Sequence, residues 1–127
     1  GEHRKRRNLM LALCDKIENY FAKDPDQESI IRSYHFWTEM AGVSRIELRN
    51  KDSVVWENGP EEQSHRILLF QHEEWEVRMN LPESSWKIDS DVKGNLLQRV
   101  SLAFLIRLEQ LESPSVISLK KNSFNVR

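Results

Sequence analysis

The chain has 127 residues, with 19 Lys and Arg against 20 Asp and Glu, and a single cysteine, Cys14. This length is typical of one domain and is enough for a hydrophobic core without disulfides or structural metals. The near-zero net charge argues against a dedicated DNA-binding domain, one cysteine excludes an internal disulfide and a Cys-based zinc site, and no apolar run reaches the ~18 residues of a membrane span.

A basic cluster opens the chain at Arg4, Lys5, Arg6 and Arg7. Such clusters occur at solvated helix ends and on the cytoplasmic side of membrane spans, where they contact anionic lipid. Both interpretations stay open, while a nucleic-acid site would need a larger basic surface. Because no Met precedes Gly1, we expect a piece of a longer protein that is cytoplasmic or lies on the cytoplasmic side of a membrane, where these four side chains would contact anionic lipid.

Residues 1–25 predict a linker or dimerisation helix. Met10, Leu13, Ile17 and Tyr20 recur at spacings of three, four and three, which is the period of a helical seam. The seam fits a parallel dimer helix or an amphipathic helix packed on its own domain, and two heptads do not decide between them. Cys14 lies on the apolar side and is expected to be a small hydrophobe, which would meet its counterpart in a dimer.

The next helix is predicted over 26–41. Asp24, Pro25 and Gln27 have the spacing of a capping box, so Asp24 is the expected cap. Gly42 suits the end of this helix. Its apolar face is formed by Ile30, Ile31, Tyr34, Trp37 and Ala41.

Beyond Gly42 the apolar period changes from 3.6 to 2. Residues 43–58 predict a hairpin with its turn at 50–52. Residues 65–71 are apolar on both sides, which is typical of a central strand covered on both faces. After a tight connection at His72, residues 74–81 alternate most regularly and predict a half-buried antiparallel strand.

The last helix is predicted over 91–112, after a loop that contains Trp86 and Ile88. One apolar stripe would cover the sheet, and a second stripe needs another partner. That partner is either the same helix of a second copy or the first helix of the same chain. Residues 116–119 in the tail could form an edge strand. The second stripe consists of Leu102, Leu105 and Ile106, which join Met10, Leu13, Ile17 and Tyr20 as the expected dimer interface.

The predicted fold class is α+β, with an antiparallel sheet of four or five strands flanked by N-terminal helices and a long C-terminal amphipathic helix. The expected division is a linker helix over 1–25, an α+β domain over 26–113 and a tail over 114–127.

Two segments give a resemblance to a known family. Residues 36–48 pass from a helix through Ala41 and Gly42 into a strand, and residues 96–109 form a long apolar helix. This order resembles the GAF domain, a sensor module of bacterial signalling proteins, with a PAS-like domain as the nearest alternative. The resemblance implies a final helix that continues into a dimeric linker. Only residues 59–64 occupy the place where GAF domains have pocket-forming helices, so the implied domain is shortened and its ligand pocket small or missing.

No catalytic motif, phosphate-binding loop or cofactor motif is present. His35 and Glu39 share a helical face but lack a third metal ligand, so we expect no metal. Trp37, Trp56 and Trp75 could line an aromatic pocket, with core packing as the alternative.

The sequence therefore predicts a non-catalytic, homodimeric regulatory or sensor domain of a larger signal-transduction protein, such as a histidine kinase or a cyclic-di-nucleotide enzyme. The alternative is a protein-interaction adaptor without ligand sensing. An enclosed cavity between sheet and helices would favour sensing, and a solid core would favour the adaptor.

Overall fold

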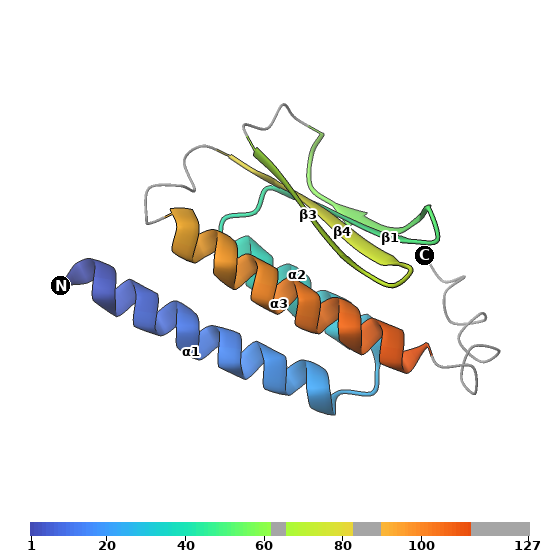
Figure 1. The fold of residues 1–127 in the computed structure, drawn as a ribbon, viewed down its shortest axis with the longest axis horizontal. Helices are drawn as coiled ribbons and strands as arrows, with labels where there is room; N and C mark the ends of the chain where they lie inside the picture. Colours follow the sequence, from blue (N-terminus) through green and yellow to red (C-terminus); the bar gives the residue numbers. More distant parts are fainter. Residues whose placement is uncertain (62–65, 83–89, 113–127) are drawn as a thin grey trace.

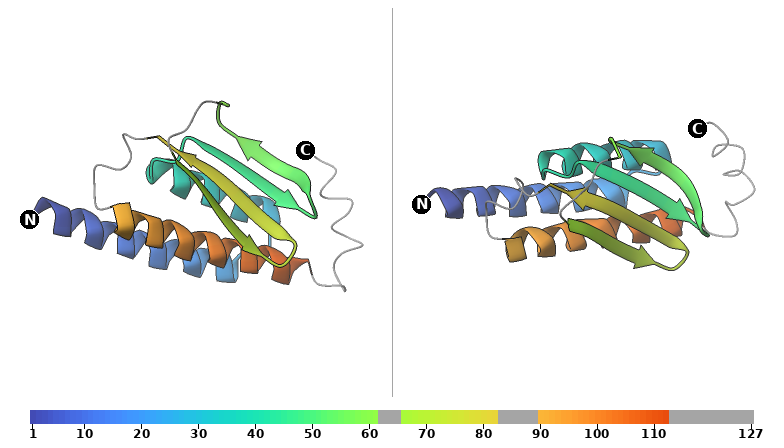
Figure 2. Two further views of the ribbon diagram at one scale, coloured as in Figure 1. Left: turned by 45° about the horizontal axis from the view of Figure 1, so that its top comes forward. Right: turned by 90° about the horizontal axis from the view of Figure 1, so that it is seen from above.

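The computed structural model describes residues 1–61, 66–82 and 90–112 and confirms the predicted α+β class. Its four strands form one antiparallel sheet in the order β2-β1-β4-β3. Helices α2 and α3 lie against one face of the sheet, and α1 lies on the far side of these two helices (Figures 1 and 2). The elements are α1 (Glu2–Lys23), α2 (Gln27–Met40), β1 (Arg45–Asn50), β2 (Ser53–Asn58), β3 (Arg66–His72), β4 (Trp75–Leu81) and α3 (Ser90–Leu111).

Two-residue turns fix the register of both hairpins. Lys51 and Asp52 both have positive φ, of 51° and 66°, as a type I′ turn requires. Glu73 has a φ of 54° in the turn between β3 and β4, where His72 pairs with Trp75. The two turns lie at the same end of the sheet, because Lys51 donates its backbone N–H to the carbonyl of Glu74.

The core lies between the sheet and the helices. Alternate residues of β1 and β4 point inward and are buried, as the period-2 pattern predicts. Helix α3 covers them with Leu97, Val100, Phe104 and Leu108, which are fully buried. The ring of Tyr34 stacks on Phe104 with centroids 3.9 Å apart. The inward residues of the two central strands are Ile46, Leu48, Trp75, Val77, Met79 and Leu81.

Helix α1 belongs to this same core. Cys14 and Phe21 of α1 are buried in it, and the Phe21 ring lies 5.7 Å from that of Phe104. Leu105, in the second apolar stripe of α3, is also fully buried. The partner that this stripe needs is therefore supplied by the same chain at Leu105, which was one of the two alternatives. Cys14 has no exposed surface through which it could meet a counterpart.

Two local predictions were wrong. The strand predicted as central is the edge strand β3, with Ile67 57% and Leu69 51% exposed on the uncovered side. Its apolar pattern therefore reflects exposed apolar side chains and not burial on two faces. The cap of α2 is Asp26, whose carboxylate accepts from the backbone N–H of Ser29 at 3.3 Å, while Asp24 ends α1.

Helix α2 ends just before Gly42, as the sequence predicted. Gly42 has a φ of 90°, and its backbone N–H donates to the carbonyl of Glu39. Trp86, Ile88 and the strand predicted over 116–119 lie outside the described residues.

Candidate functional site

An apolar groove between α1 and α2 is the main candidate site in the described part of the chain. It has a volume of about 490 Å³ and is lined by residues of these two helices and by none of the sheet. This volume is within the roughly 300–1,000 Å³ of small-molecule sites. Its walls are Leu13, Lys16, Ile17 and Tyr20 from α1, and Arg32, Ser33, Phe36, Trp37 and Met40 from α2.

The sequence places these walls by helical periodicity. Leu13, Ile17 and Tyr20 follow one another along α1, and Arg32, Phe36 and Met40 do so along α2 at intervals of four. The two helices are joined only by Asp24–Asp26, so they run antiparallel and side by side. The facing stripes of a short helical hairpin therefore form one continuous apolar trough.

The groove exposes more apolar surface than a solvated helix face needs. Phe36 is 55% and Met40 56% exposed, whereas Trp37 beside them is buried. Leu9, one turn before Leu13 on α1, is also more than half exposed and extends the apolar surface. Contiguous exposed apolar patches of this kind mark binding surfaces.

The opposite side of α1 is tied to α3 by charge. Arg99 of α3 donates to both carboxylate oxygens of Glu18, at 2.7 and 2.8 Å, and to Asp15 at 2.5 Å. These hydrogen bonds, those to Glu18 first, raise the pKa of Arg99 above its ordinary value. A bidentate arginine–carboxylate pair fixes geometry as well as adding stability. Helix α1 thus connects the groove on one side with α3 on the other.

The residues predicted for a dimer interface are divided between the groove, the core and the surface. Leu13 and Ile17 are partly buried and line the groove, together with the more exposed Tyr20. Met10 is partly buried against the core. In α3, Leu105 is buried, Leu102 is partly buried and Ile106 is 40% exposed.

The three tryptophans predicted to line a pocket lie in three different places. Trp37 is a wall of the groove. Trp75 is fully buried on β4 within the core. Trp56 lies on the edge strand β2, where its ring meets that of His35 at 5.2 Å. The groove itself was not predicted, although the 3.6-residue spacing of Phe36 and Met40 outside the core stripe of α2 was its signal.

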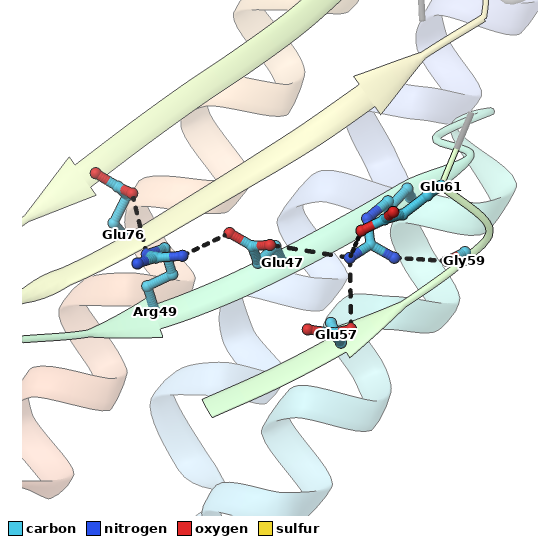
Figure 3. A network of polar contacts seen from close by, with 7 residues as sticks. Glu47, Arg49, Glu57, Gly59, Glu61 and Glu76 are labelled. Carbon is cyan, nitrogen blue, oxygen red and sulfur yellow. Dashed lines mark hydrogen bonds and ion pairs between the residues drawn. The ribbon is translucent and has the colours of Figure 1, made fainter. Parts of the chain in front are cut away.

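The uncovered face of the sheet bears a network of charges (Figure 3). Arg45 donates to the carbonyl of Gly59 at 2.6 Å and lies 3.5 Å from Glu57 and 3.8 Å from Glu47. Glu47 also accepts from Arg49 at 3.0 Å. These charged groups pair with one another, and their contacts hold β1 to β2 and to the segment that follows β2.

Neither His35 nor the basic cluster at the start of α1 forms a metal or ligand site with the described residues. His35 lies 3.6 Å from Glu39, and the described side chains contain no group of three or more potential metal ligands. Arg4, Lys5 and Arg7 are exposed on α1, and the side chain of Arg6 lies outside the described part. Within the residues that the structure describes, no helix is long and apolar enough to cross a membrane.

The comparisons with known proteins found no relative from which a family could be assigned. No family model matches the chain, and neither a curated protein nor a solved structure is significantly similar to it.

Proposed function

We propose that this chain is a non-catalytic regulatory domain of a larger signal-transduction protein, and that its input site is the groove between α1 and α2. The observation that supports this most directly is the groove itself, an apolar trough with Phe36 and Met40 more than half exposed. The interior between sheet and helices is filled by large side chains, among them Tyr34, Phe104 and Trp75. A ligand would therefore bind on the helical side of the domain.

The path of the signal would be α1. Its groove side bears Leu13, Ile17 and Tyr20, and its other side is held to α3 by the Arg99 ion pairs. An occupant that moves α1 must strain or break these pairs, so the packing of α3 would change with occupancy. Coupling of this kind requires that the occupant favour one packing over the other.

Binding of a fluorescent apolar probe, 1-anilinonaphthalene-8-sulfonate, tests the site. We expect Phe36→Gln to abolish most of the probe fluorescence and the matched control Ile67→Gln, at 57% exposure on the sheet, to leave it unchanged. Hydrogen exchange of the wild-type chain should change in both helices when the probe binds: it should slow along the groove and speed up in α3 where the Arg99 ion pairs are strained. Equal binding by both variants would place the probe elsewhere and contradict the proposal.

A protein-interaction adaptor without ligand sensing is the second candidate, and the solid core favours it. The Tyr34–Phe104 stack and the buried Trp75 occupy the space in which a sensor of the predicted kind would enclose a ligand. The same exchange measurement distinguishes the two functions. Protection that changes only along the groove, with α3 unaffected, would support the adaptor.

The homodimer stays a prediction, and it would have to use what the chain leaves uncovered. On the described parts of α1 and α3, the exposed large apolar side chains are Leu9, Leu11, Tyr20 and Ile106. A molar mass of one chain by sedimentation equilibrium at high micromolar concentration would contradict the dimer.

A further inference from the structure

The groove contains two cations that nothing in the described part of the chain neutralises. Lys16 of α1 and Arg32 of α2 line it, and neither forms an ion pair or hydrogen bond with a described residue. One comes from each wall, so the two charges flank the same trough. Basic side chains that edge an apolar site attract a negatively charged group.

No described carboxylate of α1 or α2 forms an ion pair with Lys16 or Arg32, and this includes the exposed Glu28, four residues before Arg32. Asp15 and Glu18, the neighbours of Lys16, hold Arg99 on the other side of α1. Glu39 lies beside His35. The Tyr20 hydroxyl and the backbone N–H of Asp26 hydrogen bond to Asp24, and these contacts lower the pKa of its carboxyl. Lys16 and Arg32 therefore stay unpaired in the groove, although Asp24 lies beside its Tyr20 wall and the whole chain has a net charge of -1.

The remaining walls suit a hydrocarbon tail. Leu13, Ile17, Phe36, Trp37 and Met40 present aliphatic, aromatic and thioether surface, and methionine adapts to flexible apolar ligands. The exposed Leu9 continues this surface along α1 beyond the groove. Because Phe36 and Met40 are more than half exposed, the groove is open to solvent there, and a linear chain could lie against them without closure of the protein around it.

We infer that the groove binds a free, single-chain amphipathic anion of the fatty-acid type, with its tail against Phe36 and Met40 and its carboxylate between Lys16 and Arg32. This inference rests on the proposed function, since it names the ligand class of the same site. It would make the domain responsive to the concentration of free fatty acid. Displacement of α1 by the tail would be the event that reaches α3.

Three probes, each with a linear ten-carbon chain, separate the contribution of charge from that of apolar contact: decanoate, decanol and decyltrimethylammonium. Binding to the full chain is followed by amide chemical shifts. We expect decanoate to shift groove residues of α1 and α2 and to bind at least about tenfold more tightly than the cation. The double variant Lys16→Glu/Arg32→Glu should reverse this order, and Lys16→Gln/Arg32→Gln should remove it. Arg78→Glu, on the uncovered sheet face, is the matched control and should keep the wild-type order.

The outcomes that contradict the inference are distinct. If decanol and the cation bind the groove as tightly as decanoate, the groove remains the input site and the anionic ligand is wrong. If no tail shifts the groove residues, both the inference and the proposed site fail. If decanoate binding weakens as the protein dimerises, the groove is occupied by a second copy of the chain and the inference is wrong. Cosedimentation with phosphatidylglycerol vesicles in the absence of decanoate binding would assign the surface to a membrane instead.

Discussion

The buried hydrogen bond between Tyr34 and Ser101 allows a quantitative test of how α2 is held to α3. The Tyr34 hydroxyl lies 2.6 Å from Ser101 Oγ, and neither residue is exposed. Burial raises the pKa of Tyr34 above its ordinary value, so the hydroxyl keeps its proton and can donate. A hydrogen bond contributes ~0.5–1.5 kcal/mol net, whereas a buried polar group without a partner costs ~1–3 kcal/mol.

The two partners are not equivalent, and this sets the expected order of effects. Ser101 lies within α3, so without the tyrosine hydroxyl it can donate to the carbonyl four residues earlier in its own helix. Tyr34 is fixed by its stack on Phe104 and would bury an unpaired hydroxyl. We therefore expect Ser101→Ala to lower the free energy of unfolding by ~1–3 kcal/mol and Tyr34→Phe by ~0.5–1.5 kcal/mol. The double variant should lose less than the sum.

Urea denaturation of the wild type, both single variants and the double variant gives the coupling free energy. For a protein of this size, m is roughly 1–3 kcal/mol/M, so a loss of ~2 kcal/mol moves the midpoint by about 1 M. Tyr20→Phe is the control: it removes an exposed hydroxyl that pairs with Asp24, where water can replace the lost partner, and should change stability by no more than ~0.5 kcal/mol. Additive losses, or a larger loss in Tyr34→Phe than in Ser101→Ala, would refute the reasoning.

Three further changes test other parts of the fold. Arg99→Met removes the ion pairs to α1 and should lower the free energy of unfolding by about 1 kcal/mol, a modest loss because the guanidinium is partly exposed. It should also speed amide exchange in α1, and unchanged exchange would contradict the link between α1 and α3. Gly59→Ala should cost more than ~1 kcal/mol in calorimetry, because φ is 106° and the new Cβ would lie 2.8 Å from the Cα of Arg45; an unchanged melting temperature would oppose this. Burial raises the pKa of the Cys14 thiol to about 11, so the folded state resists deprotonation and stability should fall as pH rises from the unfolded pKa of ~8.5 toward 11. Cys14→Val should show a smaller fall over that range.

Periodicity predicted most of the fold because its signals are local. The alternation in Trp75–Leu81 gave a strand with inward Trp75, Val77, Met79 and Leu81, all of which are buried. Two helical seams and the turn at Lys51–Asp52 were likewise visible in the sequence. Each of these features depends on neighbours within a few residues, so no tertiary information was needed.

The place of each strand in the sheet was not predictable by the same means. The pattern of β3 is equally compatible with a covered central strand and with an edge strand that exposes apolar side chains. The sheet order decides between them, because β4 pairs with β1 on one side and β3 on the other. That order depends on pairing between segments about 30 residues apart, for which hydropathy along the chain has no signal.

The groove was missed for a related reason, and this changes the interpretation of α1. In the sequence, the apolar seam of α1 has the pattern of a single surface that either packs on the domain or binds a second copy. In the structure, Cys14 and Phe21 face the core, Leu13 and Tyr20 face the groove, and Glu18 faces α3. Because α1 packs on the core and is ion-paired to α3, it cannot move without altering both contacts. For this reason an occupant of the groove that moves α1 would act on α3, although the described residues between sheet and helices are packed with large side chains.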